Sequence, residues 1–92
     1  MREVYGIAAF RSRQQVLMLE NTLRREGVGV RVVTTPRDVA LGCGLSVRFD
    51  MGDIDRVERA IRNQRPTNLV GVYRVENRGG GRPALTPVGI YR

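Results

Sequence analysis

Two segments of the chain carry apolar residues at helical spacing, and each lies between runs of residues typical of β-strands. The first segment spans residues 12–26, where Ser12 and Gln15 form a capping-box pattern. The second begins at Asp53, expected as its N-cap, and ends at Pro66, which cannot continue a helix. Because each segment has a single apolar stripe, both are expected to be helices that pack on a sheet.

Four runs rich in β-branched and apolar residues predict the strands of that sheet, over residues 3–10, 28–34, 45–49 and 69–75. Thr35 and Pro36 resemble a helix start, with room for about one turn before Gly42. The order of the main elements is strand, helix, strand, strand, helix, strand. It predicts an α+β, ferredoxin-like βαββαβ fold, with a four-stranded antiparallel sheet and two helices on one face.

The composition changes after residue 76, which suggests a domain over residues 1–76 and a separate tail over residues 77–92. Asn77 to Pro83 is a flexible linker by its glycine content. Ala84 to Tyr91 is mildly apolar. It is either a loose tail or an added strand that pairs with an edge of the sheet or with another subunit.

Arginine supplies all 16 basic residues, and the chain has neither lysine nor histidine. This composition excludes lysine Schiff-base chemistry, histidine acid–base catalysis and a Cys/His zinc site, so an enzyme is not expected. The net charge of +7 favours an anionic partner. No signal-peptide pattern or membrane-spanning run is present, and a single cysteine suits a reducing compartment, so a cytoplasmic protein is expected.

Cys43 is the most reactive side chain that the sequence offers, and it lies between Gly42 and Gly44. Its neighbours have no side chains to cover the sulfur, so the thiol is expected to be accessible. Arg37 and Arg48 are the candidate charges that would stabilise a thiolate, and the backbone amides from Gly42 to Gly44 could add donors.

Each of these residues also has an ordinary structural interpretation. Strict strand alternation would point Cys43 into the core, as a small buried residue. Arg37 could be a solvated loop charge or a partner of Asp38, and Arg48 a charge on the open face of the sheet. A helical turn before Gly42 would place the thiol at a helix C-terminus, which disfavours an anion.

The chain resembles the selenium/sulfur carrier protein-like family of small bacterial domains in three short motifs and in the spacing between them. These motifs are Thr35-Pro36-Arg37, Cys43-Gly44 and Arg48-Phe49. The resemblance covers about residues 4–75. It implies that Cys43 carries sulfur or selenium as a persulfide or selenide, between a desulfurase-type donor enzyme and an acceptor protein, without a cofactor. Leu41-Gly42 stands where the family commonly has serines, and the glycine-rich tail lies outside the family pattern.

The sequence is also compatible with two other functions. A four-stranded sheet with helices behind it is the architecture of RNA-recognition modules, and the positive charge fits nucleic acid. Against this, the open face of residues 45–49 would present Ser46 and Arg48 where stacking rings are expected. A regulatory or assembly domain, in which the chain forms a homodimer, is the third alternative.

Overall fold

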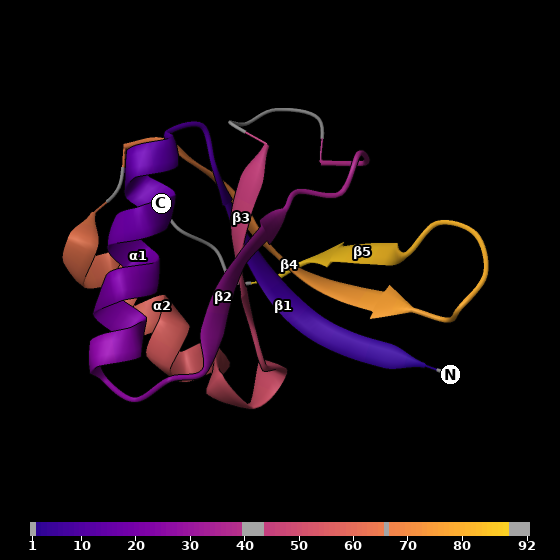
Figure 1. Ribbon diagram of the computed structural model, residues 1–92, viewed down its shortest axis with the longest axis horizontal. Coiled ribbons are helices and arrows are strands. Elements are labelled where there is room, and N and C mark those ends of the chain that lie inside the picture. The colour runs from indigo at the N-terminus through magenta and orange to yellow at the C-terminus, as the bar shows by residue number, and fades with distance from the viewer. Residues whose placement is uncertain (1, 40–43, 66, 89–92) are drawn as a thin grey trace.

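The computed structural model describes residues 2–39, 44–65 and 67–88. In these ranges one sheet has the strand order β2-β3-β1-β4-β5, with all neighbouring strands antiparallel. Both helices lie on the same side of it (Figure 1). The elements are β1 (Glu3–Phe10), α1 (Arg13–Arg25), β2 (Val30–Thr34), β3 (Leu45–Phe49), η1 (Met51–Asp53), α2 (Ile54–Gln64), β4 (Leu69–Asn77) and β5 (Ala84–Pro87).

The α+β class and the antiparallel sheet are therefore confirmed, but the expected count of four strands is wrong. The fifth strand, β5, comes from the tail and pairs along β4, from Tyr73 opposite Pro87 to Glu76 opposite Ala84. It extends the sheet at the β4 edge (Figure 1). In this structure, residues 84–87 are part of the same sheet as the rest of the chain.

The end of α1 explains why β2 begins later than predicted. Gly27 adopts a left-handed φ of 82°. Its N–H donates to the Arg24 carbonyl at 3.1 Å, and the Val28 N–H donates to the Leu23 carbonyl at 3.0 Å. These two bonds form a Schellman motif. Val28 therefore belongs to the helix end, and the strand starts at Val30. At the other end of α1, Ser12 accepts from the Gln15 N–H as predicted.

The start of α2 differs from the sequence prediction. Asp53 makes no side-chain capping bond. Asp50 instead accepts from the Gly52 N–H at 2.8 Å and begins the 3-10 turn η1, which leads directly into α2. Asp53 is thus the N-cap residue of α2 by position, as predicted, but its side chain does not cap the helix, because the helical path begins one turn earlier. Pro66, the expected stop, lies outside the described residues.

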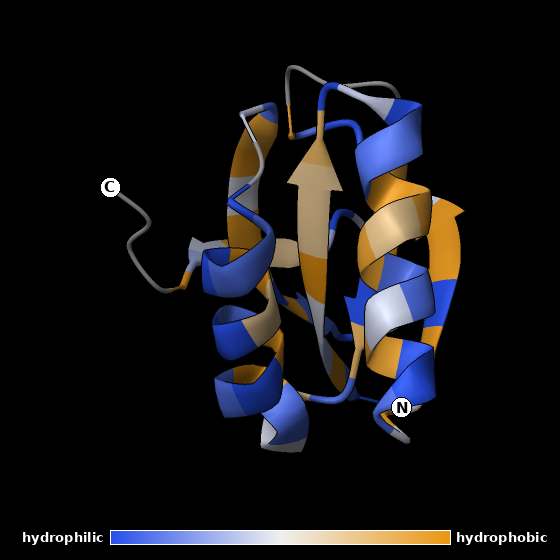
Figure 2. Ribbon diagram, turned by 90° about the vertical axis from the view of Figure 1, so that its left-hand side faces the viewer, coloured by the Kyte–Doolittle hydropathy of each residue, from blue (hydrophilic) through white to orange (hydrophobic). Residues whose placement is uncertain are grey.

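The main core lies between the helices and one face of the sheet. Apolar stripes on both helices face the strands in Figure 2. The buried members of this core are Ala8, Phe10, Val16, Leu19, Leu23, Val28, Val47, Phe49, Val57, Ala60, Ile61 and Val72. The predicted stripes are thus core residues, as expected from their spacing.

The opposite face of the sheet carries a second, smaller cluster. Its buried residues are Ile7, Ala9, Val39 and Val75, with Tyr5, Val33, Val70, Tyr73 and Leu85 packed against them. Val39 follows β2 and is 9% exposed. The chain after β2 therefore covers part of the face that the helices leave open.

None of the helices in the described part of the chain is long and apolar enough to cross a membrane.

Candidate functional site

The segment that carries Cys43 joins β2 to β3, and both of its ends are fixed. The Thr35 N–H donates to the Gly44 carbonyl at 2.9 Å. The Thr35 and Ser46 hydroxyl oxygens lie 2.6 Å apart, which is a hydrogen bond between the two strands. Cys43 and Gly42 lie outside the described residues, so their predicted roles stay predictions. The structure does place Gly44, the next residue after Cys43, at the exposed end of this hairpin.

Gly44 has a left-handed φ of 87°, and a Cβ added to it would meet nothing within 4 Å. Extended residues alternate between the two faces of a sheet only while the backbone stays extended. Since the extended path ends at Gly44, the alternation of Leu45, Val47 and Phe49 does not assign Cys43 to the core. This conformation removes the main sequence argument for a buried thiol.

Thr35 and Pro36 do not begin a helix in the described residues. A single turn forms instead, in which the Val39 N–H donates to the Pro36 carbonyl at 3.0 Å. Thr35 uses its own backbone and hydroxyl to close the hairpin, which leaves it no capping role. The expected unfavourable helix C-terminus before the thiol therefore has no counterpart in residues 35–39.

Two contacts attach this turn to the rest of the fold. Val39 packs into the second cluster with Ile7, Ala9 and Val75. An Arg82 guanidinium nitrogen lies 3.3 Å from an Asp38 carboxylate oxygen, so the loop between β4 and β5 reaches the turn. The chain leading to Cys43 is thus held by apolar packing and by one ion pair. Because this ion pair is exposed, it contributes little to stability by itself.

The structure separates the two arginines that the sequence grouped around Cys43. Arg37 is exposed at the turn, and within the described residues it forms no ion pair, because Asp38 pairs with Arg82. Arg48 lies four residues along β3 from Gly44, a distance of about 13 Å in an extended strand. Its guanidinium binds the Glu3 carboxylate at 2.9 Å and lies 3.8 Å from the centre of the Tyr5 ring.

The contacts of Arg48 lead away from the thiol-bearing segment. Gly6 is opposite Phe49 in the register of β1 and β3, and Ala9 is opposite Ser46. Tyr5 and Glu3 therefore lie beyond the Phe49 end of β3, whereas Gly44 lies at the Ser46 end. Among the predicted stabilising residues, Gly44 and Arg37 belong to the hairpin that bears Cys43, and Arg48 has its contacts elsewhere.

An arginine cluster that sequence reasoning missed surrounds Glu76. Its side chain is 8% exposed and meets Arg2 at 3.0 Å, Arg74 at 3.2 Å and Arg78 at 2.9 Å. Hydrogen bonds from Arg78 and then Arg74 lower the pKa of the Glu76 carboxyl below its ordinary 4.5. Arg74 and Glu76 alternate with period two and so share one face of β4, and Arg78 follows the end of that strand.

We expect Glu76→Gln to destabilise the fold at neutral pH, because three guanidinium groups would lose their shared counter-ion. The pKa is lowered in the folded state. The contribution of Glu76 is therefore fully present above the unfolded pKa near 4.5 and is lost as pH falls through the folded pKa. Urea unfolding of both proteins between pH 7 and pH 2 should show a difference that shrinks below about pH 4.5.

Glu26→Gln is the matched control for this prediction, since Glu26 is exposed and in no ion pair with any residue that the structure describes. Its unfolding curve should follow the wild type through the same pH range. The role assigned to the cluster is contradicted if Glu76→Gln and the wild type have the same unfolding free energy at pH 7. It is also contradicted if their difference in unfolding free energy is unchanged at pH 2.

The chain matches the family model described as "Putative Se/S carrier protein-like" over residues 5–74. The chain belongs to this family. The match to this Se/S carrier family includes the thiol-bearing segment and ends within β4, so β5 lies outside it. Neither the curated proteins nor the solved structures give a match.

Candidate metal ligands do not gather in the described ranges of this family member: no group of three or more cysteine, aspartate and glutamate side chains lies close enough to hold an ion.

Proposed function

We propose that the protein is a non-catalytic sulfur or selenium carrier of the cytoplasm, in which Cys43 holds the transferred atom. Membership of the Se/S carrier family over residues 5–74 is the observation that carries this proposal. The left-handed, exposed Gly44 supports it, because the residue that precedes it need not follow the strand into the core. A lone cysteine also suits the reducing compartment that a persulfide carrier needs.

In the transfer, the Cys43 thiolate attacks the outer sulfur of a persulfide on a desulfurase-type donor. A sulfur–sulfur bond forms on Cys43 as the bond in the donor breaks, and the donor cysteine leaves as a thiolate. No net oxidation occurs, and the acceptor protein receives the sulfur by the same exchange in reverse. Selenium held on the donor as a perselenide would pass by the same exchange: the Cys43 thiolate attacks the selenium, the donor cysteine leaves as a thiolate, and Cys43 then carries S–Se⁻.

Stabilisation of the anionic persulfide falls to the groups nearest the hairpin. Arg37 is exposed on the turn before the segment and, within the described residues, forms no ion pair, so it is the candidate cation, and the Gly42 and Gly44 amides are the candidate donors. Arg48 acts at longer range in this proposal, because Glu3 already neutralises it.

We further propose that β1 to β4 and the two helices form a ferredoxin-like βαββαβ unit to which β5 is appended. The strand order β2-β3-β1-β4 and the placement of both helices against one core support this. This arrangement leaves the thiol-bearing hairpin at an edge of the sheet, where a donor or acceptor protein can approach it.

The carrier function is tested by incubating the protein with a cysteine desulfurase and L-cysteine and then weighing it intact. The proposal predicts the addition of one sulfur atom, located on Cys43 by fragmentation and removed by dithiothreitol. A donor that is active with another acceptor but adds no sulfur here would falsify the proposed function.

A further inference from the structure

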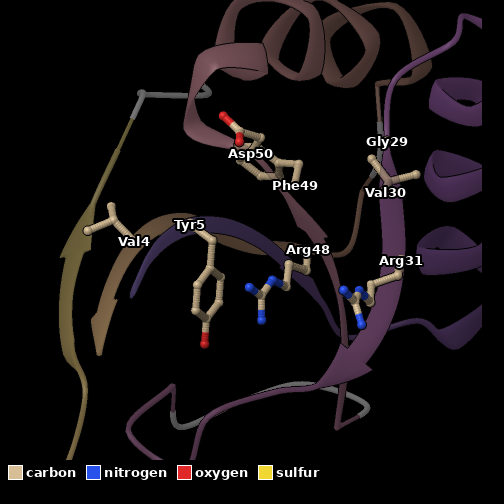
Figure 3. A pocket seen from close by; sticks show the side chains of 8 residues that line it. All are labelled: Val4, Tyr5, Gly29, Val30, Arg31, Arg48, Phe49 and Asp50. Atoms are coloured by element: carbon tan, nitrogen blue, oxygen red, sulfur yellow. The ribbon is translucent and has the colours of Figure 1, made fainter. Parts of the chain in front are cut away.

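A cavity of about 420 Å³ opens at the end of the sheet opposite to Gly44. The first residues of β1 and β2 and the last residues of β3 line it, and Tyr5, Arg31, Arg48 and Asp50 supply its polar groups. Figure 3 shows the Tyr5 ring, the Arg48 guanidinium and the Arg31 guanidinium in a row on one side of the sheet, with the Asp50 carboxylate directed to the other side. This volume is in the range of pockets that hold small organic ligands.

The two arginines are direct neighbours across the sheet. Arg31 of β2 lies opposite Arg48 of β3 in the antiparallel register. Two like charges in this position destabilise a strand pair unless a third group lies between them. Arg31 has no ion pair or side-chain hydrogen bond to any residue that the structure describes. Its guanidinium donors are therefore available to a ligand.

Arg48 is already held in place for such a ligand. The Tyr5 ring lies against its guanidinium at 3.8 Å, one of its terminal N–H groups binds Glu3, and its side chain is only 27% exposed. A guanidinium fixed before binding loses less rotational freedom when a ligand arrives. Tyr5 and Glu3 thus position Arg48, and its remaining donors face the cavity that Arg31 shares (Figure 3).

Two acidic residues limit the charge of the ligand: Asp50, which lines the cavity, and Glu3, which lies outside the lining but binds Arg48. Glu3 neutralises one of the two arginines, and Asp50, although bonded to the Gly52 N–H at 2.8 Å, adds a negative charge at the rim. Binding must therefore rely on directed N–H donors more than on net charge. A tetrahedral oxyanion suits this arrangement, since its oxygens can accept forked hydrogen bonds from two guanidinium groups on different strands.

We propose that Arg31 and Arg48 together form a binding site for the phosphate group of a small phosphate ester or of a nucleic-acid backbone. The site lies at the opposite end of β3 from Gly44 and shares only Arg48 with the proposed carrier function. The ring of Tyr5 supports Arg48 and is not a free stacking surface, so the site recognises the phosphate and not a base.

Nitrogen-15 NMR titrations at constant ionic strength, with chloride as the balancing salt, test the proposal with three probes: inorganic phosphate, uridine monophosphate and a short oligouridylate. The arginine side-chain signals of Arg31 and Arg48 are expected to shift with at least one probe. A stronger response to the oligonucleotide identifies a nucleic-acid backbone as the ligand. An equal or stronger response to the mononucleotide identifies a small ester.

Arg31→Gln is expected to weaken this binding about tenfold or more, which corresponds to the loss of a charge-assisted, forked contact. Arg56→Gln is the matched control, because Arg56 is an exposed residue of α2 and the same charge is removed. Arg31 is also exposed, so both variants should fold. Shifts no larger than those caused by chloride, or equal weakening in both variants, overturn the proposal.

Discussion

The Gly6→Val variant is expected to lose about 3 kcal/mol or more of its unfolding free energy, the upper end of the cost of overpacking a core. Gly6 lies opposite Phe49 in the β1–β3 register, and the Phe49 ring folds over it. A Cβ at Gly6 would approach that ring to 2.3 Å. Phe49 is 1% exposed and packed in the main core, so the ring has no free space to enter. Equilibrium urea unfolding measures the loss.

Gly29→Val is the matched control for this variant. Gly29 precedes β2, lacks a left-handed φ, and a Cβ there would meet nothing within 4 Å. Its unfolding free energy should change by no more than about 0.5 kcal/mol. The double variant Gly6→Val/Phe49→Leu should lose less unfolding free energy than the sum of the losses in the two single variants, because the two side chains occupy the same space. Strict additivity would contradict the close packing of this pair.

The Cys43→Ser variant is expected to lose sulfur loading completely in the desulfurase assay. The sequence contains no other thiol, and a hydroxyl does not form a persulfide. Its unfolding free energy should stay within about 0.5 kcal/mol of the wild type, as for a side chain outside the core. Intact mass spectrometry reads the first result and urea unfolding the second.

Two outcomes would contradict this expectation. Sulfur that still adds to the serine variant would show that the atom is not held on Cys43. A loss of several kcal/mol of unfolding free energy in the serine variant would show that the thiol lies in the apolar interior. Cys43 would then have a structural role and not a carrier role.

Residues with strong local preferences made most of the fold predictable. The Ser12 cap, the stripe of Val16, Leu19 and Leu23 and the core side of β3, with Val47 and Phe49, each depend on neighbours in sequence, and the structure has them as expected. The strand count was wrong because pairing of Ala84 to Pro87 with β4 depends on the exposed edge that β4 offers, which no local pattern shows.

The candidate site was less predictable, because its contacts join residues far apart in the chain. Arg48 was expected near Cys43 from sequence distance, but an extended strand carries it about 13 Å from Gly44. Its partners Glu3 and Tyr5 come from the other end of the chain. Ser46, expected on an open face, is fully buried because the Thr35 side of the hairpin covers it. The contacts of Arg48 and the burial of Ser46 both depend on how β1, β3 and β2 pair, and this pairing register is seen only in the three-dimensional structure.

The rate at which Cys43 reacts with iodoacetate in the folded protein, measured from pH 5 to pH 10, tests the account most directly. We expect reaction without denaturant and a half-maximal rate below the ordinary thiol pKa of about 8.5, because the proposed carrier site has the thiolate exposed and stabilised by the positive charge of Arg37. Arg37→Gln should move that midpoint upward, and the exposed Arg62→Gln on α2 should not. A thiol that reacts only after urea unfolds the protein would contradict the account.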